Sequence, residues 1–100
     1  MRVALPHDLG REEVRRRLRE RSHEIADYVP GGMAQVDTRW RGEDVMELSV
    51  GAMGQNITGE VEVEENQVIF SIELPAMLSF VQPMIESAIR SKGTKMLEKK

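Results

Sequence analysis

The chain of 100 residues has few side chains whose type and spacing suit catalysis or metal binding. Its two histidines, His7 and His23, are not one helical turn apart, as a helical metal site requires. There is no cysteine, which excludes thiolate ligands, a cysteine nucleophile and disulfides. His7 follows Pro6 at the expected junction between a strand and a helix, and we expect it to cap or fill the edge of the core.

Carboxylates and serines offer no catalytic arrangement either. Glu60, Glu62 and Glu64 alternate along one strand, so they share a solvent-facing side and do not form a buried acid–base pair. The serines lack the nucleophile-elbow pattern, and the glycine pairs lack the lysine of a phosphate loop. We therefore expect no catalytic residues, no metal site, no cofactor and no enzymatic activity.

The charge pattern excludes one class of partner. A net charge of -3 argues against nucleic acid, whose binding depends on neutralising phosphates. The arginines between Arg11 and Arg21 could form a patch for phosphate or anionic lipid. The favoured interpretation is a solvated helix face carrying ion pairs, namely Glu12–Arg16, Glu13–Arg17 and Arg16–Glu20.

No apolar run approaches the roughly 20 residues that span a bilayer. The first residues, Met1 to His7, have one positive charge and no long apolar segment, so we expect no secretory signal. These features predict a cytoplasmic protein without a transmembrane segment.

Four stretches between Ala34 and Leu74 alternate apolar and polar residues, which is typical of strands with one buried face. Short turns separate them at Gly42-Glu43, Met53-Gly54 and Glu65-Asn66. Consecutive hairpins predict an antiparallel meander with one apolar and one acidic face. Trp40 shares the parity of Val36, so we expect it on the apolar face, touching the second helix.

The flanking segments complete the expected fold. A short strand is predicted at Arg2 to Leu5, a helix at about Arg11 to Tyr28 and a longer helix at about Ala76 to Met96. Pro83 should kink that last helix or mark the start of its main segment. The prediction is a single α+β domain over residues 1–100: a two-layer, antiparallel β-meander covered on one face by both helices, in the order β-α-β-β-β-β-α.

The C-terminal helix has two adjacent apolar rows. A single sheet is expected to cover only one of them. The methionines are expected mainly to fill gaps in the core, and the alternative is that one row lines a plastic apolar groove between helix and sheet. The predicted groove residues are Met46, Leu48, Val61, Phe70, Met77, Phe80, Met84 and Ile85. Leu78 and Val81 are expected to stay exposed, as a patch for homodimerisation or docking, unless a strongly curled sheet wraps the helix and buries them.

Several short motifs, in order along nearly the whole chain, resemble the polyhydroxyalkanoic acid system family of small bacterial proteins. They are His7-Asp8-Leu9-Gly10, Trp40-Arg41-Gly42-Glu43-Asp44, the strand Ile57–Val63 with Gly59, and Leu74-Pro75 followed by Ile85-Glu86 and Ile89. The resemblance implies a context, polyhydroxyalkanoate (PHA) granules or their gene cluster, and carries over no catalytic residue. It implies structural roles for His7, Leu9, Gly10, Trp40, Gly42 and Gly59.

Two functions are compatible with these features. The first is a non-enzymatic accessory protein of PHA metabolism that binds an apolar granule surface, an acyl chain or a granule-associated protein. The alternative is a small carrier of a lipid or other apolar ligand, unrelated to granules, because the order of elements resembles a shortened helix-grip fold.

Overall fold

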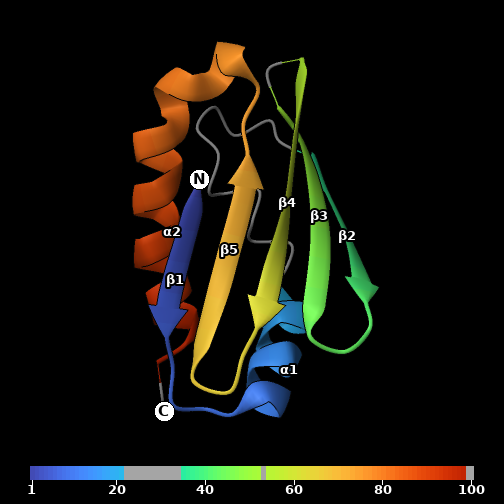
Figure 1. Ribbon diagram of the computed structural model, residues 1–100, viewed down its shortest axis with the longest axis vertical. Helices are drawn as coiled ribbons and strands as arrows, with labels where there is room; N and C mark the ends of the chain where they lie inside the picture. Colours follow the sequence, from blue (N-terminus) through green and yellow to red (C-terminus); the bar gives the residue numbers. More distant parts are fainter. Residues whose placement is uncertain (22–34, 53, 99–100) are drawn as a thin grey trace.

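The computed structural model describes residues 1–21, 35–52 and 54–98 (Figure 1). His23 and the predicted end of the first helix at Tyr28 lie outside the described residues. The elements are β1 (Arg2–Pro6), α1 (Arg11–Arg21), β2 (Gln35–Arg41), β3 (Val45–Ala52), β4 (Gln55–Val63), β5 (Gln67–Glu73), the 3-10 helix η2 (Ala76–Val81) and α2 (Gln82–Met96). The predicted α+β class and element order are confirmed.

The five strands form one antiparallel sheet in the order β1-β5-β4-β3-β2. The predicted meander is therefore confirmed, with hairpins joining β2 to β3, β3 to β4 and β4 to β5. Gly42 and Gly54 in two of these turns have φ of 75° and 71°, a region that residues with a Cβ rarely adopt. The N-terminal strand β1 completes the sheet by pairing with β5, placing Val3 opposite Phe70.

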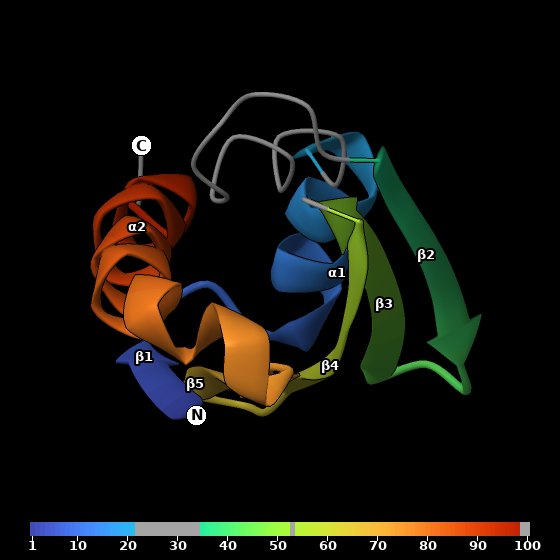
Figure 2. The same cartoon turned by 90° about the horizontal axis from the view of Figure 1, so that it is seen from above.

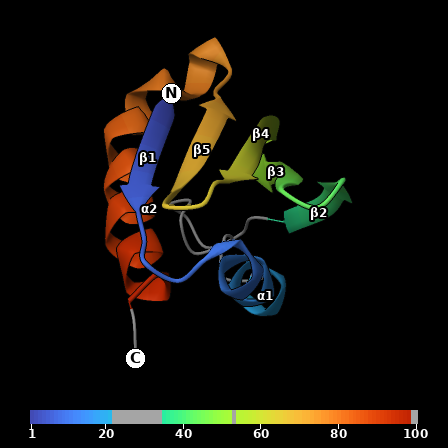
Figure 3. The same cartoon turned by 60° about the horizontal axis from the view of Figure 1, so that its bottom comes forward.

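The sheet curves around the two helices, which both lie on its concave side (Figure 2). Figure 3 shows α2 beside β1 and α1 beneath the other part of the sheet. The inward-facing side chains of the strands meet Val14 and Leu18 of α1 in one hydrophobic core. The helices thus cover the apolar face, which buries the alternate residues that set the strand pattern.

Two glycines allow neighbouring segments to approach closely, one between two strands of the sheet and one between α2 and β1. A Cβ on Gly59 would lie 2.6 Å from the carbonyl oxygen of Ser71 and 2.7 Å from Cδ1 of Ile72. A Cβ on Gly93 would lie 2.6 Å from Cδ1 of Leu5. Gly93 is buried, so α2 packs directly against β1 at this point. This contact fixes which side of α2 faces the sheet.

The C-terminal helical segment is divided at its beginning. Residues Ala76–Val81 form η2, and α2 begins at Gln82 with Pro83 in its first turn. A proline there costs no hydrogen bond, because the first amides of a helix have no partner within it. Pro83 therefore marks the start of the main helix, one of the two predicted outcomes.

Trp40 lies on the apolar face, packed partly against the core, as predicted. The helix beside it is α1, since the guanidinium carbon of Arg19 lies 5.0 Å from the centroid of the indole ring. The prediction that Trp40 touches the second helix is wrong. The reason is the strand order: α2 packs on β1, at the opposite edge of the sheet from β2.

Candidate functional site

Three large apolar side chains are exposed at the junction between η2 and α2. Met77, Phe80 and Met84 have exposed fractions of 71%, 68% and 52%. We call these three residues the apolar cluster. Exposed apolar residues are common singly, but large ones gathered on one surface are typical of interaction sites.

Local geometry explains how the cluster forms. In a 3-10 helix, side chains three residues apart eclipse each other, so Met77 and Phe80 lie in one line and Leu78 and Val81 in another. The second line continues along α2 through Ile85 and Ile89 to Gly93 at helical spacing. Because Gly93 packs on Leu5, that second line faces the sheet.

The two apolar rows therefore occupy the opposite positions from those predicted. Leu78 and Val81 are only 4% and 2% exposed, so the expectation of an exposed patch at these residues is wrong. Met77, Phe80 and Met84, expected in a groove against the sheet, instead face solvent. The physical reason is the rotation of α2 about its own axis. Gly93 packs on Leu5, so the row that contains Gly93 is the buried one.

The other five predicted groove residues, Met46, Leu48, Val61, Phe70 and Ile85, belong to the hydrophobic core. Met46 and Val61 have 0% exposure, and a space large enough for a ligand would leave accessible surface on the side chains around it. The eight residues thus do not surround one groove. Methionine at position 46 acts as core filler, which is the interpretation favoured for the methionines.

The sequence segment that carries the apolar cluster is uncharged. The segment Leu74–Ile85 contains no Asp, Glu, Lys or Arg, although 31% of all residues are charged. The amide nitrogen Nε2 of Gln55, at the start of β4, lies 3.7 Å from Sδ of Met77. The cluster therefore presents a surface on which an apolar partner meets no charge from its own segment.

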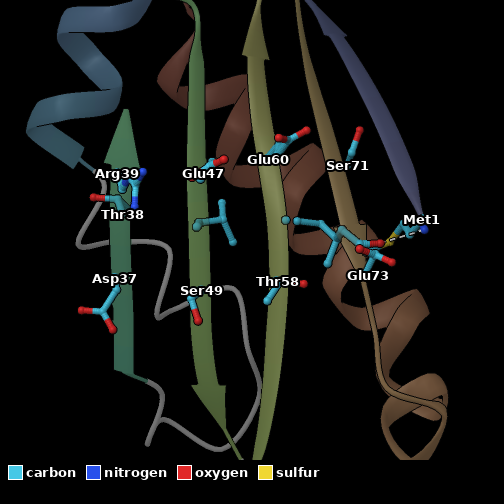
Figure 4. Close-up of a pocket in the computed structure, with 13 residues that line it drawn as sticks. Met1, Asp37, Thr38, Arg39, Glu47, Ser49, Thr58, Glu60, Ser71 and Glu73 are labelled. Carbon is cyan, nitrogen blue, oxygen red and sulfur yellow. Dashed lines mark hydrogen bonds between the residues drawn. The ribbon is translucent and has the colours of Figure 1, made fainter. Parts of the chain in front are cut away.

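The outer face of the sheet is a second surface, lined by the polar residues that alternate with the core (Figure 4). Cross-strand rows run Asp37, Ser49, Thr58, Glu73 and Arg39, Glu47, Glu60, Ser71. They line an open depression of about 820 Å³. Arg41 Nη1 donates to Glu47 Oε2 at 2.8 Å, and its Nη2 donates to Glu60 Oε2 at 2.6 Å. These exposed charges neutralise each other at the surface. The depression is open to solvent, so it does not enclose a ligand.

His7 joins the first loop to the last hairpin. The backbone N–H of Leu9 donates to Nδ1 at 3.2 Å, so the ring proton lies on Nε2, which donates to the carbonyl of Glu64 at 2.9 Å. Gly10 follows with a φ of 84° and allows the chain to turn into α1. Both ring nitrogens serve structure, which explains the predicted structural role of His7, Leu9 and Gly10.

The motif from Trp40 to Asp44 connects the β2–β3 hairpin to α1 and β4. Arg15 Nη1 lies 2.7 Å from Asp44 Oδ1, and Arg11 Nε lies 3.9 Å from Oδ2 of the same residue. The backbone N–H of Val63 donates to the carbonyl of Asp44 at 2.7 Å. Gly42 makes the turn that places Asp44 there. The sequence showed the motif, but only the folded chain shows which arginines Asp44 contacts.

The arginine-rich helix carries the ion pairs expected of a solvated face, with one change of partner. Glu13–Arg17 and Arg16–Glu20 form as predicted, while Arg16 contacts Glu13 and not Glu12. Hydrogen bonds from Arg16 and Arg17 lower the pKa of Glu13 from 4.5 to about 2.

Arg17 has a further role that the sequence did not indicate. Its Nη1 donates to the carbonyls of Met96 and Glu98, each at 2.7 Å. A cation at the end of a helix is also favoured by the helix dipole. Arg17 therefore connects α1 to the C-terminal end of α2.

Among the described residues, no His, Asp and Glu side chains gather in a group of three or more that could hold a metal ion. Within the same part of the chain, no helix is long and apolar enough to cross a membrane.

These features define a small α+β protein with an open antiparallel sheet, two helices on one face and an exposed apolar cluster at the start of the C-terminal helix. A family model described as "Putative polyhydroxyalkanoic acid system protein" matches residues 1–97. The chain therefore belongs to this polyhydroxyalkanoic acid system family, as its motifs predicted. No curated protein and no solved structure is significantly similar to the chain, so the likeness to a helix-grip fold stays a prediction.

Proposed function

We propose that this protein is a non-enzymatic accessory protein of PHA metabolism, which docks on the apolar surface of granules through Met77, Phe80 and Met84. The single observation that carries the proposal is the exposure of these three large side chains in one uncharged segment. Membership of the PHA system family supplies the context.

Burial energetics support an apolar surface as the partner. Removing a Met or Phe side chain from water contributes about 1.5–3 kcal/mol, so three such residues supply useful affinity together. Pro83 and Gln82, which lie between Phe80 and Met84, are also exposed and carry no charge. A broad apolar surface can cover this segment without desolvating an ionic group.

The packing of the core favours docking over carriage of a ligand inside the protein. The side chains expected to line a pocket are either fully packed or on the surface. The ring nitrogens of His7 are both occupied by backbone groups, which supports a role without catalysis. The proposal therefore needs no interior cavity and no chemical step, and it locates the protein in the cytoplasm at granules.

Co-sedimentation with bare polyhydroxybutyrate particles tests the proposal. We expect the wild-type protein to sediment with the particles, and the triple variant M77Q/F80Q/M84Q to bind at least about tenfold more weakly. The matched control is S79Q/S87Q/S91Q, which changes three exposed residues of the same two helices and should bind like wild type.

Circular dichroism of both triple variants confirms that each is folded. Wild-type protein that stays in solution with the particles, or a cluster variant that binds as well as wild type, contradicts the proposal. In a PHA-accumulating host, a tagged protein should surround the granules, and the cluster variant should be distributed through the cytosol.

A further inference from the structure

The strand β2 is an open edge of the sheet. It pairs with β3 on one side, and no described strand pairs with it on the other (Figure 1). Edge strands present backbone N–H and C=O groups that can pair with another strand, and proteins use such edges to add a strand from a partner. The residues of β2 indicate which strand fits.

We infer that β2 is the interface of a homodimer, in which the β2 strands of two copies pair antiparallel about a two-fold axis at Thr38. Thr38 is the midpoint of Gln35–Arg41, so this register pairs the whole strand with its copy. It places Asp37 opposite Arg39 of the second copy, and Val36 opposite Trp40 of the second copy. The two sheets then continue as one.

Charge complementarity selects this register. Asp37 and Arg39 both lie on the outer face, both are exposed, and neither forms an ion pair within the described part of the chain. Pairing about Thr38 brings together two Asp37–Arg39 pairs, one on each side of the axis. A two-fold axis at Asp37 or at Arg39 would instead place that charge opposite its own copy, which is unfavourable.

The inner face is complementary as well. Val36 and Trp40 pack against the core but are only partly buried, because β2 is the last strand of the sheet. Cross-strand pairs of an aromatic and a β-branched residue stabilise antiparallel sheets. In the dimer, each Trp40 gains a Val36 neighbour, and both lose exposed apolar surface.

The symmetry of the pairing agrees with the fold. Directly opposite residues of an antiparallel pair point to the same face, so the axis is perpendicular to the sheet. The helices of both copies therefore stay on one side, and their apolar faces remain covered. The interface is isologous and closed, which limits assembly to a dimer.

A charge-swap experiment tests the inference. D37R and R39D each place like charges opposite one another, and each should weaken dimerisation by about tenfold or more, measured by analytical ultracentrifugation. The double variant D37R/R39D restores opposite charges and should dimerise like wild type. An equimolar mixture of the two single variants should form the heterodimer.

The control is E73R, which makes the same charge change on the outer face but on β5, and should leave dimerisation unchanged. Neither Asp37 nor Arg39 has an ion-pair partner within the described monomer, so the dissociated variants should unfold thermally like wild type that has been diluted until it is monomeric. A monomeric wild-type protein at concentrations on the order of 1 mM overturns the inference. So does a double variant that folds but stays monomeric.

Discussion

Single residues in this protein act mainly as connectors between segments distant in sequence. His7 uses both ring nitrogens to join the β1–α1 loop to the β4–β5 turn. Asp44 joins the first hairpin to α1 through Arg15. These contacts give a structural reason for residues in the family motifs, since each one connects a loop or turn to another segment of the fold.

Glu13 should make stability depend on pH in the acid range. Its pKa falls from 4.5 to about 2 on folding, because Arg16 and Arg17 donate hydrogen bonds to the carboxylate. A lowered pKa stabilises the folded state above the unfolded value and loses that effect as pH falls toward 2. We expect E13Q to melt below wild type at neutral pH, with the difference shrinking as the pH approaches 2.

The control for E13Q is E12Q, which removes the same charge from the neighbouring position. Glu12 makes no hydrogen bond or ion pair with other described residues, so E12Q should melt close to wild type. A gap between E13Q and wild type that persists unchanged in acid would contradict the assignment.

At the scale of elements, the rotation of η2 and α2 about their axes decides which apolar side chains enter the core and which lie on the surface. The buried row runs through Leu78, Val81 and Ile85, and the exposed row through Met77, Phe80 and Met84. Both rows consist of apolar residues only. Stability measurements can distinguish them, because only buried side chains leave a cavity when shortened.

L78A should lower the free energy of unfolding by about 2–5 kcal/mol, as expected for a buried Leu. M77A, a truncation of an exposed residue in the same helix, should change it by no more than about 0.5 kcal/mol. Urea denaturation followed by circular dichroism measures both. Equal losses for the two variants would show that Met77 packs in the core.

For the whole molecule, Arg17 links the first helix to the end of the last one. Its side chain is 14% exposed and donates to the carbonyls of Met96 and Glu98. R17M keeps much of the aliphatic stem but removes these bonds. We expect it to lower the free energy of unfolding by about 1–3 kcal/mol, since hydrogen bonds to charged groups are stronger than neutral ones.

Hydrogen exchange should also become faster at the C-terminal end of α2 in R17M. R16M is the matched control, because Arg16 bonds Glu13 and Glu20 within α1 only, and should have a much smaller effect. If R16M and R17M destabilise the protein equally, the ion pairs within α1 matter and the link to α2 does not.

The sequence by itself determined the strands, the meander and the face on which the core lies. Alternation in β2 to β5 and glycines at positions 42 and 54 are local signals, and side-chain period and turn geometry follow directly from them. The same local signals placed Pro83 near a helix start. The short motifs, in their order along the sequence, also predicted the family.

Only the tertiary structure decided which apolar row of the C-terminal helix is exposed, which helix covers Trp40 and which strand pairs with β1. The residues of the candidate site were recognised as apolar and functional, but Met77, Phe80 and Met84 were expected in a groove, and Leu78 and Val81 outside. Because both rows are apolar throughout, the helical period alone does not specify which row is buried. The close approach of Gly93 to Leu5, between residues at opposite ends of the chain, set the rotation of the helix and so decided which row faces solvent.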